Sequence, residues 1–213
     1  MSGLDVADLA TGSAVFDARL QNGAVVFKNQ LLLSASLRQY MTIDAFTTGQ
    51  RGLTFSCWFR SSNSGTSARM FDFGNGPNAD NILMEVFNNY LQVAAVYYSG
   101  TSKFLNTNLN INDNVLHHAA WVLSKSGLWI LYVDGSVVVQ QSTQAYPASV
   151  SRLLNYIGKS NWAATNADPY FNGAIRDFRV YNYNLSSAEV GLLFNSAEVS
   201  LLRKITSYNY FNF

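Results

Sequence analysis

The sequence contains little charge and shows no surplus of either sign. Charged residues make up only 13% of its 213 residues, and the formal net charge is +1. This share is about half of that in an ordinary globular protein. A chain without a basic surplus has no electrostatic attraction for nucleic acid or for an anionic membrane. We therefore expect no nucleic-acid partner. No apolar run approaches the length that spans a bilayer, so we also expect no membrane insertion.

A cysteine pair and a secretory leader are also missing. The single cysteine, Cys57, cannot form an internal disulfide. It alternates with Phe55 and Phe59, which predicts a buried and unreactive thiol. Residues 1–6 have neither the basic segment nor the apolar segment of a signal peptide. We therefore expect synthesis in the cytoplasm, which allows later incorporation into a virion or another particle.

Apolar and aromatic residues, by contrast, are plentiful. Hydrophobic residues make up 48% of the chain and aromatic residues 14%, which is enough for a sizeable core. Nothing that resembles a linker divides the chain, so one domain is expected. Short apolar segments alternate with turns rich in Gly, Asn and Ser, and this pattern predicts an all-β domain.

Alternation along the chain predicts individual strands. Leu53–Arg60 is a strong strand because every second residue from Leu53 is apolar or cysteine. The segment Leu128–Gln141 forms a hairpin, since Asp134-Gly135 supplies the positive φ angles of a type I′ turn. In the last strand, Ala174–Tyr181, strict alternation places four residues on one face: Ala174, Arg176, Phe178 and Val180.

A short helix is predicted after this last strand. Ser186 and Glu189 have the spacing of a capping box, which opens a helix that ends at about Asn195. Val190, Leu193 and Phe194 give this helix one apolar face.

The closing part of the sequence resembles a known family. The runs Ile-Gly-Lys-Ser-Asn-Trp at 157–162, Asp-Pro-Tyr-Phe-Asn-Gly at 168–173 and Asp-Phe-Arg-Val-Tyr-Asn at 177–182 resemble laminin-G-like domains of the concanavalin A-like lectin/glucanase superfamily. The resemblance extends from about Phe16 to about Phe194. It implies a two-sheet antiparallel jelly-roll sandwich with one short C-terminal helix. The expected organisation is an N-terminal arm at 1–15, the sandwich at 16–197 and an aromatic C-terminal tail at 198–213.

The sequence offers no catalytic constellation. Glycoside hydrolysis needs two carboxylates across the scissile bond, and Glu85 has no acid two residues before or after it. His117 and His118 are adjacent on one predicted strand, so they point to opposite faces and cannot share a site. We expect no catalytic residue and a protein that is not an enzyme. A glycoside hydrolase relic is the distant alternative.

No cofactor and no metal residue is expected, and a structural calcium ion is the one alternative. Members of the superfamily often hold Ca²⁺ through an Asp in the last strand, and Arg176 occupies the matching position here. Asp72 and Asp80 on the predicted rim could supply oxygen ligands instead, although their loop also has the composition of an ordinary polar turn.

Four residues near the rim are candidates for ligand binding: Trp162, Asn161, Asp168 and Tyr170. An aromatic ring that stacks on a sugar, beside amide and carboxylate groups that bind hydroxyls, is a common recognition arrangement. The same residues also suit a structural role, in which Trp162 closes the end of the sandwich and the polar groups bind loop backbone.

The tail is the second candidate surface. Tyr208, Tyr210, Phe211 and Phe213 are too apolar to remain in water, so they pack on this domain or contact a partner chain. Together with the low charge, this favours a non-catalytic structural or assembly module, such as a virion capsid or fibre component, that binds other protein chains. The alternative is a lectin-like carbohydrate-binding domain with glycans as partners.

Overall fold

A computed structural model describes most of the chain. The described residues are 18–27, 30–49, 51–63, 66–97, 101–142, 146–163 and 168–195, together with the backbone of 209–210. The predicted arm at 1–15 and the side chains of the predicted tail at 198–213 lie outside the described residues.

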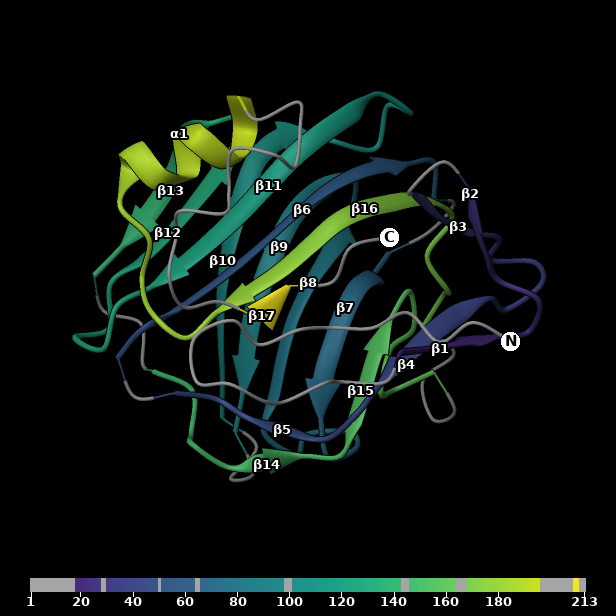
Figure 1. Ribbon diagram of the computed structural model, residues 1–213, viewed down its shortest axis with the longest axis horizontal. Helices are drawn as coiled ribbons and strands as arrows, with labels where there is room; N and C mark the ends of the chain where they lie inside the picture. Colours follow the sequence, from purple (N-terminus) through teal and green to yellow (C-terminus); the bar gives the residue numbers. More distant parts are fainter. Residues whose placement is uncertain are drawn as a thin grey trace.

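Within the described residues, the strands form two large antiparallel sheets that lie face to face (Figure 1). Sheet A contains, in spatial order, β1 (Ala18–Gln21), β4 (Tyr40–Ile43), β15 (Leu154–Ile157), β7 (Ala68–Gly74), β8 (Asn81–Phe87), β9 (Tyr90–Val96) and β10 (Ser102–Asn110). Sheet B contains β13 (Ser136–Gln141), β12 (Trp129–Val133), β11 (Leu116–Leu123), β6 (Leu53–Ser61), β16 (Gly173–Tyr181), β3 (Gln30–Leu33) and β2 (Val25–Phe27). A small third sheet joins β5 (Phe46–Thr47) to β14 (Ser151–Arg152). The predicted jelly-roll sandwich is confirmed.

The core lies between the two sheets and is built from aromatic rings. Phe55 on β6 stacks on Phe71 on β7 with a centroid distance of 5.0 Å, and Trp121 lies 5.6 Å from Phe55. Cys57 is buried within this core, and burial, with a smaller effect of Asp177, raises the pKa of its thiol to about 12. The predicted burial of Cys57 is therefore confirmed, and the raised pKa disfavours the thiolate, which is the reactive form.

The predicted turn and helix are also present. Asp134 and Gly135 have φ angles of 49° and 77° between β12 and β13, as a type I′ turn requires. Helix α1 (Ser187–Asn195) begins after Ser186, whose backbone N–H donates to Glu189 Oε2 at 2.7 Å. Buried Val190 and Leu193 pack this helix on the outer face of sheet B (Figure 1).

The prediction for the faces of β16 was wrong. The pairing of β16 with β6 shifts between Arg176 and Arg179, and Asp177 in this bulge has a φ of 50°. A bulge adds one residue and so reverses the alternation beyond it. The core therefore receives Ile175, Phe178 and Val180, whereas Arg176 lies over the ring of Trp58 on the outer face.

Two backbone residues of the tail pair with this same strand. β17 (Asn209–Tyr210) is antiparallel to β16, with Tyr210 opposite Arg179 and Asn209 opposite Val180. The aromatic side chains of the tail lie outside the described residues, so their contact with a partner stays a prediction.

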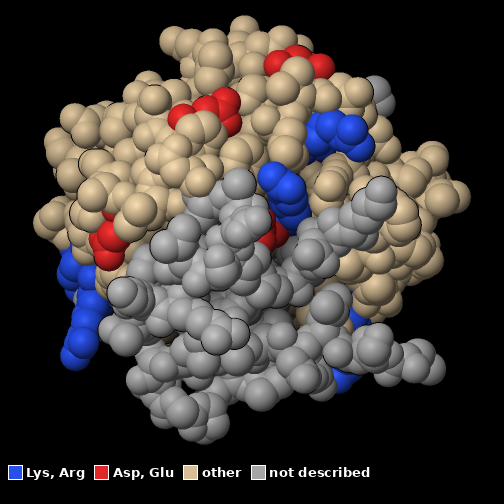
Figure 2. Space-filling view, turned by 45° about the horizontal axis from the view of Figure 1, so that its top comes forward, with Lys and Arg blue, Asp and Glu red and all other residues tan. Residues whose placement is uncertain are grey.

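The surface agrees with the low charge of the sequence. On the face in Figure 2, most of the described residues are uncharged, and only a few Lys, Arg, Asp and Glu side chains lie among them. In the described part of the chain, α1 is far too short to cross a membrane, and no longer apolar helix is present.

Gly173 at the start of β16 provides a test of this packing. Its φ is +150°, and a Cβ atom there would overlap the carbonyl oxygen of Arg60 on β6. We expect Gly173→Ala to lower the free energy of unfolding by about 3 kcal/mol, because both the backbone angle and the strand spacing would have to change. Urea unfolding followed by tryptophan fluorescence measures this.

The matched control is Gly191→Ala within α1, where a Cβ atom would meet no atom within 4 Å. This change should raise the free energy of unfolding by about 0.5–1 kcal/mol, since alanine favours a helix. Equal stabilities for the two variants would contradict the described approach of β16 to β6.

Candidate functional site

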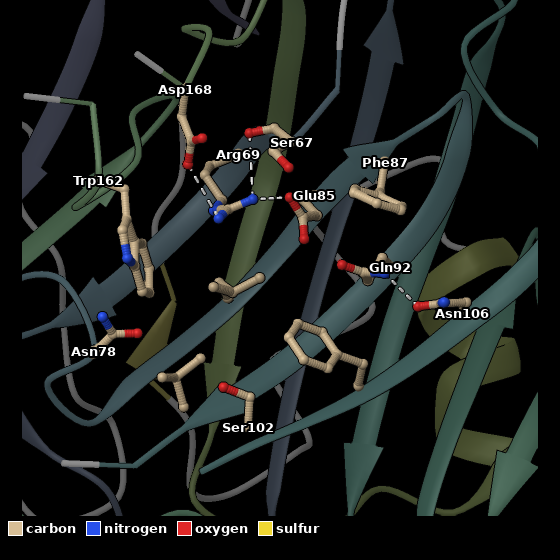
Figure 3. Close-up of a pocket in the computed structure, with 13 residues that line it drawn as sticks. Ser67, Arg69, Asn78, Glu85, Phe87, Gln92, Ser102, Asn106, Trp162 and Asp168 are labelled. Carbon is tan, nitrogen blue, oxygen red and sulfur yellow. Dashed lines mark hydrogen bonds and ion pairs between the residues drawn. The ribbon is translucent and has the colours of Figure 1, made fainter. Parts of the chain in front are cut away.

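A hollow of about 500 Å³ opens on the outer face of sheet A (Figure 3). Its floor is the outward side of three consecutive strands, where every second residue faces away from the core. These residues are Leu83, Glu85 and Phe87 on β8, Gln92 and Val96 on β9, and Ser102, Phe104 and Asn106 on β10. The intervening residues Met84, Val86, Val93 and Ala95 point into the core, so one alternating pattern builds both the core and the hollow.

The connection between β15 and β16 forms one wall of the hollow. Trp162 and Asp168 come from this connection, of which residues 158–163 and 168–172 are described. Trp162 packs on Leu83, Ala94 and Val96 and is only 9% exposed. Most of its ring is therefore used to attach the connection to the sheet.

Asp72 on β7 holds the same connection from below. Its carboxylate is fully buried and accepts hydrogen bonds from the backbone N–H of Asn161 at 2.8 Å and from Asn161 Nδ2 at 3.0 Å. Asn81 Nδ2 donates to it as well, at 2.9 Å. Burial raises the pKa of Asp72, and Arg69 and these hydrogen bonds oppose that rise.

Arg69 joins the wall to the floor (Figure 3). Its Nη1 atom pairs with Glu85 Oε2, and its Nη2 atom donates to Asp168 Oδ2 at 3.2 Å. The guanidinium carbon lies 5.5 Å from the ring centroid of Trp162, and Ser160 Oγ donates to Asp168 at 2.8 Å. Burial lowers the pKa of Arg69, whereas the charges of Asp72 and Asp168 act in the opposite direction.

The four predicted ligand-binding residues do not share one site. Trp162 and Asp168 line the hollow, but the side chain of Asn161 is turned toward Asp72. Tyr170 lies elsewhere, with its ring centroid 6.0 Å from that of Tyr40.

Tyr170 belongs to an aromatic cluster over β4 and β15. The ring centroids of Tyr40 and Tyr156 are 5.7 Å apart, and Lys159 Nζ lies 4.5 Å from the first and 4.2 Å from the second. These residues lie on the same sheet as the hollow but do not line it.

The residues of the floor were not predicted from the sequence. Phe104 is 47% exposed on the edge strand β10, and Gln92 Nε2 donates to Asn106 Oδ1 at 2.6 Å beside it. The alternation of Ser102, Phe104 and Asn106 was a usable signal, but only if the outward face of this strand had been treated as a site.

A buried serine–histidine pair lies on the other sheet. Ser56 Oγ and His118 Nε2 are 2.9 Å apart, and both residues are buried on the outer face of sheet B. Phe194 of α1 and Trp58 stack above them with a centroid distance of 5.6 Å. The space beside the pair is about 10 Å³, which leaves no room for a substrate.

Asp72 and Asp80, the two acids that could supply ligands to calcium, make separate hydrogen bonds within the protein. Asp72 binds Asn161 and Asn81, whereas the carbonyl oxygen of Asp80 accepts from Arg152 Nε at 2.8 Å. Among the described residues, no three His, Cys, Asp or Glu side chains come together as a metal group. A structural calcium ion stays a prediction.

Comparison with protein families agrees with the fold. The family model Laminin_G_3, described as concanavalin A-like lectin/glucanases superfamily, matches residues 35–191. A search of curated protein sequences found no match.

Solved structures with the same fold include several binding domains. A heptameric SAP-like pentraxin from Limulus polyphemus has a TM-score of 0.56 at 15% identity, over 73% of this chain and 76% of the pentraxin. The binding domain of botulinum neurotoxin DC, in complex with SialylT, has a TM-score of 0.63 at 14% identity over 92% of this chain. This chain spans about half of that domain, 52%. The CBM40 domain of a Ruminococcus gnavus IT-sialidase, bound to α2,3 sialyllactose, has a TM-score of 0.59 at 15% identity, over 68% of this chain and 83% of the domain.

The buried His118 makes stability depend on pH. Burial lowers the pKa of His118 to about 4, an effect that Asp134 opposes and Arg179 reinforces, from 6.5 in a free side chain. The unfolded chain therefore binds a proton first, and stability falls as the pH drops from about 6.5 to 4. The loss is about 3 kcal/mol. We expect His118→Gln to flatten this part of a plot of unfolding free energy against pH.

His117 serves as the control for His118, because its pKa is shifted in the opposite direction. Burial lowers its pKa, but the hydrogen bonds and charges of Asp134 and Asp113 outweigh burial and raise it. Its contribution is therefore fully present below pH 6.5 and is lost as the pH rises above that value. We expect His117→Gln to remove this loss of stability above pH 6.5 and to leave the decline between pH 6.5 and 4 in place. The same slope in both variants would argue against the described burial of His118.

Proposed function

We propose that this chain, which belongs to the concanavalin A-like lectin/glucanase superfamily, is a non-catalytic carbohydrate-binding module whose ligand occupies the hollow on sheet A. The observation that carries the proposal is the combination of an exposed ring, Phe104, with the amides of Gln92 and Asn106 on one floor. Sugar sites commonly pair an aromatic face with polar side chains that bind hydroxyls.

The floor has unused capacity for hydrogen bonds with a sugar. A primary amide has two donors and an acceptor oxygen, and the bond from Gln92 to Asn106 uses one donor and one acceptor site. Ser102 and Asn78 add a hydroxyl and a further amide at the edges of the hollow (Figure 3). Several weak bonds of this kind, together with the ring of Phe104, suit a shallow glycan site.

The two acids of the hollow are arranged for binding rather than cleavage. Glycoside hydrolysis needs one carboxylic acid that donates a proton and a second carboxylate across the bond. Glu85 and Asp168 instead both pair with the same guanidinium, that of Arg69. Two structural neighbours that were solved with a glycan ligand, a neurotoxin binding domain and CBM40, are also binding domains.

The comparisons give more support to this proposal than to the assembly interpretation. The pentraxin, neurotoxin and CBM40 matches include domains solved with a sialylated ligand, and none of these matches describes a virion component. The assembly interpretation depends on the tail side chains at 198–213, which lie outside the described residues. Partner chains and particle incorporation therefore stay predictions.

Substitution of Phe104 tests the proposal. A glycan array identifies a bound sugar, and titration calorimetry then compares the native chain with Phe104→Ala. We expect affinity to fall roughly tenfold or more, because loss of a stacked ring costs on the order of 1–2 kcal/mol. Gln92→Ala should weaken binding as well, since it removes an amide from the floor.

The control is Phe27→Ala on β2, which lies in sheet B and removes a ring that is 60% exposed. This variant should bind like the native chain. Absence of any glycan binding on a broad array, or equal affinity for the Phe104 and Phe27 variants, would contradict the proposed site.

A further inference from the structure

The hollow contains more acid than base. Among the described residues that line it, Arg69 is the one basic side chain, and Glu85 and Asp168 are acidic. Both acids pair with Arg69, so the lining carries one formal negative charge in excess. Glu85 and Arg69 are almost fully buried, where water screens charge poorly.

Arg69 is already occupied by groups of its own chain. Nη1 pairs with Glu85 and donates to the carbonyl oxygen of Ser67 at 3.3 Å, and Nη2 donates to Asp168 at 3.2 Å. One face of the guanidinium lies against Trp162 (Figure 3). A ligand carboxylate could bind Arg69 only by displacing one of these acids, and the displaced acid would then be left in the hollow without its cationic partner.

From these contacts we infer that the hollow selects uncharged glycans and rejects those that carry a carboxylate, such as sialylated or uronic acid-containing glycans. The inference rests on the proposed function and adds the ligand class. It separates this chain from its structural neighbours, since the neurotoxin and CBM40 structures hold SialylT and α2,3 sialyllactose. The shared fold therefore does not carry the ligand class with it.

The electrostatic effect is large enough to measure. A ligand carboxylate in the hollow would meet a net negative charge at close range, and the repulsion should weaken binding by roughly tenfold or more. The hydroxyl groups of an uncharged sugar avoid this repulsion and can donate to the carboxylate of Asp168, whose side chain is 17% exposed.

An array that presents uncharged oligosaccharides beside their sialylated and uronic acid counterparts tests the inference with the full chain. Titration calorimetry then measures the best uncharged glycan and the same glycan with an added carboxylate sugar. The native chain should bind the uncharged member at least about tenfold more tightly. Asp168→Asn should narrow this ratio, because asparagine keeps an acceptor for Ser160 and Arg69 but removes the charge.

Two further variants complete the design. Glu85→Gln should also narrow the ratio of the affinities for the uncharged and the carboxylate-bearing glycan. The inference can then still be tested if one of the two variants folds poorly. Glu189→Gln removes the same unit of charge from the start of α1 on sheet B, and it should leave the ratio unchanged.

The outcomes separate the two proposals. Preference for the carboxylate-bearing member, or equal affinity for both members, would overturn the inference while leaving carbohydrate binding in place. An unchanged ratio in both Asp168→Asn and Glu85→Gln would also overturn it, because the preference would then have another cause. Absence of binding to every glycan would overturn the proposed function itself.

Discussion

Arg69 and Asp72 are charged residues that lie beneath other groups on the outer face of sheet A, and neither can stay buried without partners. Several of these partners come from a distant part of the chain, the connection between β15 and β16. Asn161 binds Asp72, Asp168 binds Arg69, and the ring of Trp162 covers the guanidinium. This requirement places the connection on the sheet, and the hollow exists because the connection stands beside a floor that it does not cover.

The outer faces of the two sheets are covered by different elements. On sheet B, α1 packs over Tyr132 and Tyr181, and Phe194 closes the space above His118. On sheet A, the connection covers β7 and part of β8 and β9, whereas the outward residues of β10 remain exposed. The candidate site lies on sheet A, whereas α1 covers part of the outer face of sheet B.

Local chemistry explains which parts of the structure could be predicted from the sequence. The turn at Asp134-Gly135 and the capping box at Ser186 depend on neighbouring residues alone, and both were predicted correctly. The bulge at Asp177 depends on how β16 pairs with β6, so an alternation rule assigned its faces wrongly.

The candidate site was predicted only in part for the same reason. The motif around Trp162 and Asp168 was recognised within one segment, but the floor needs the pairing of β8, β9 and β10 and the knowledge of which face is covered. Asn161 shows the opposite kind of error, because it was predicted to bind a ligand and instead has a structural role. An amide next to an exposed-looking tryptophan suggested a ligand contact, whereas a buried aspartate far away in the sequence takes its hydrogen bonds.

The floor of the hollow comes from three strands that follow one another along the chain and pair as neighbours. Their inward residues hold the two layers together. Their outward residues include Leu83, Glu85 and Val96, which contact Trp162 or Arg69, and the more exposed residues of β10. Substitutions at the exposed outward positions of β10 should therefore cost folding less than substitutions at the buried outward positions of β8 and β9. A lineage could diversify what it recognises by drift in this short meander alone, much as related folds reuse one scaffold for unrelated targets.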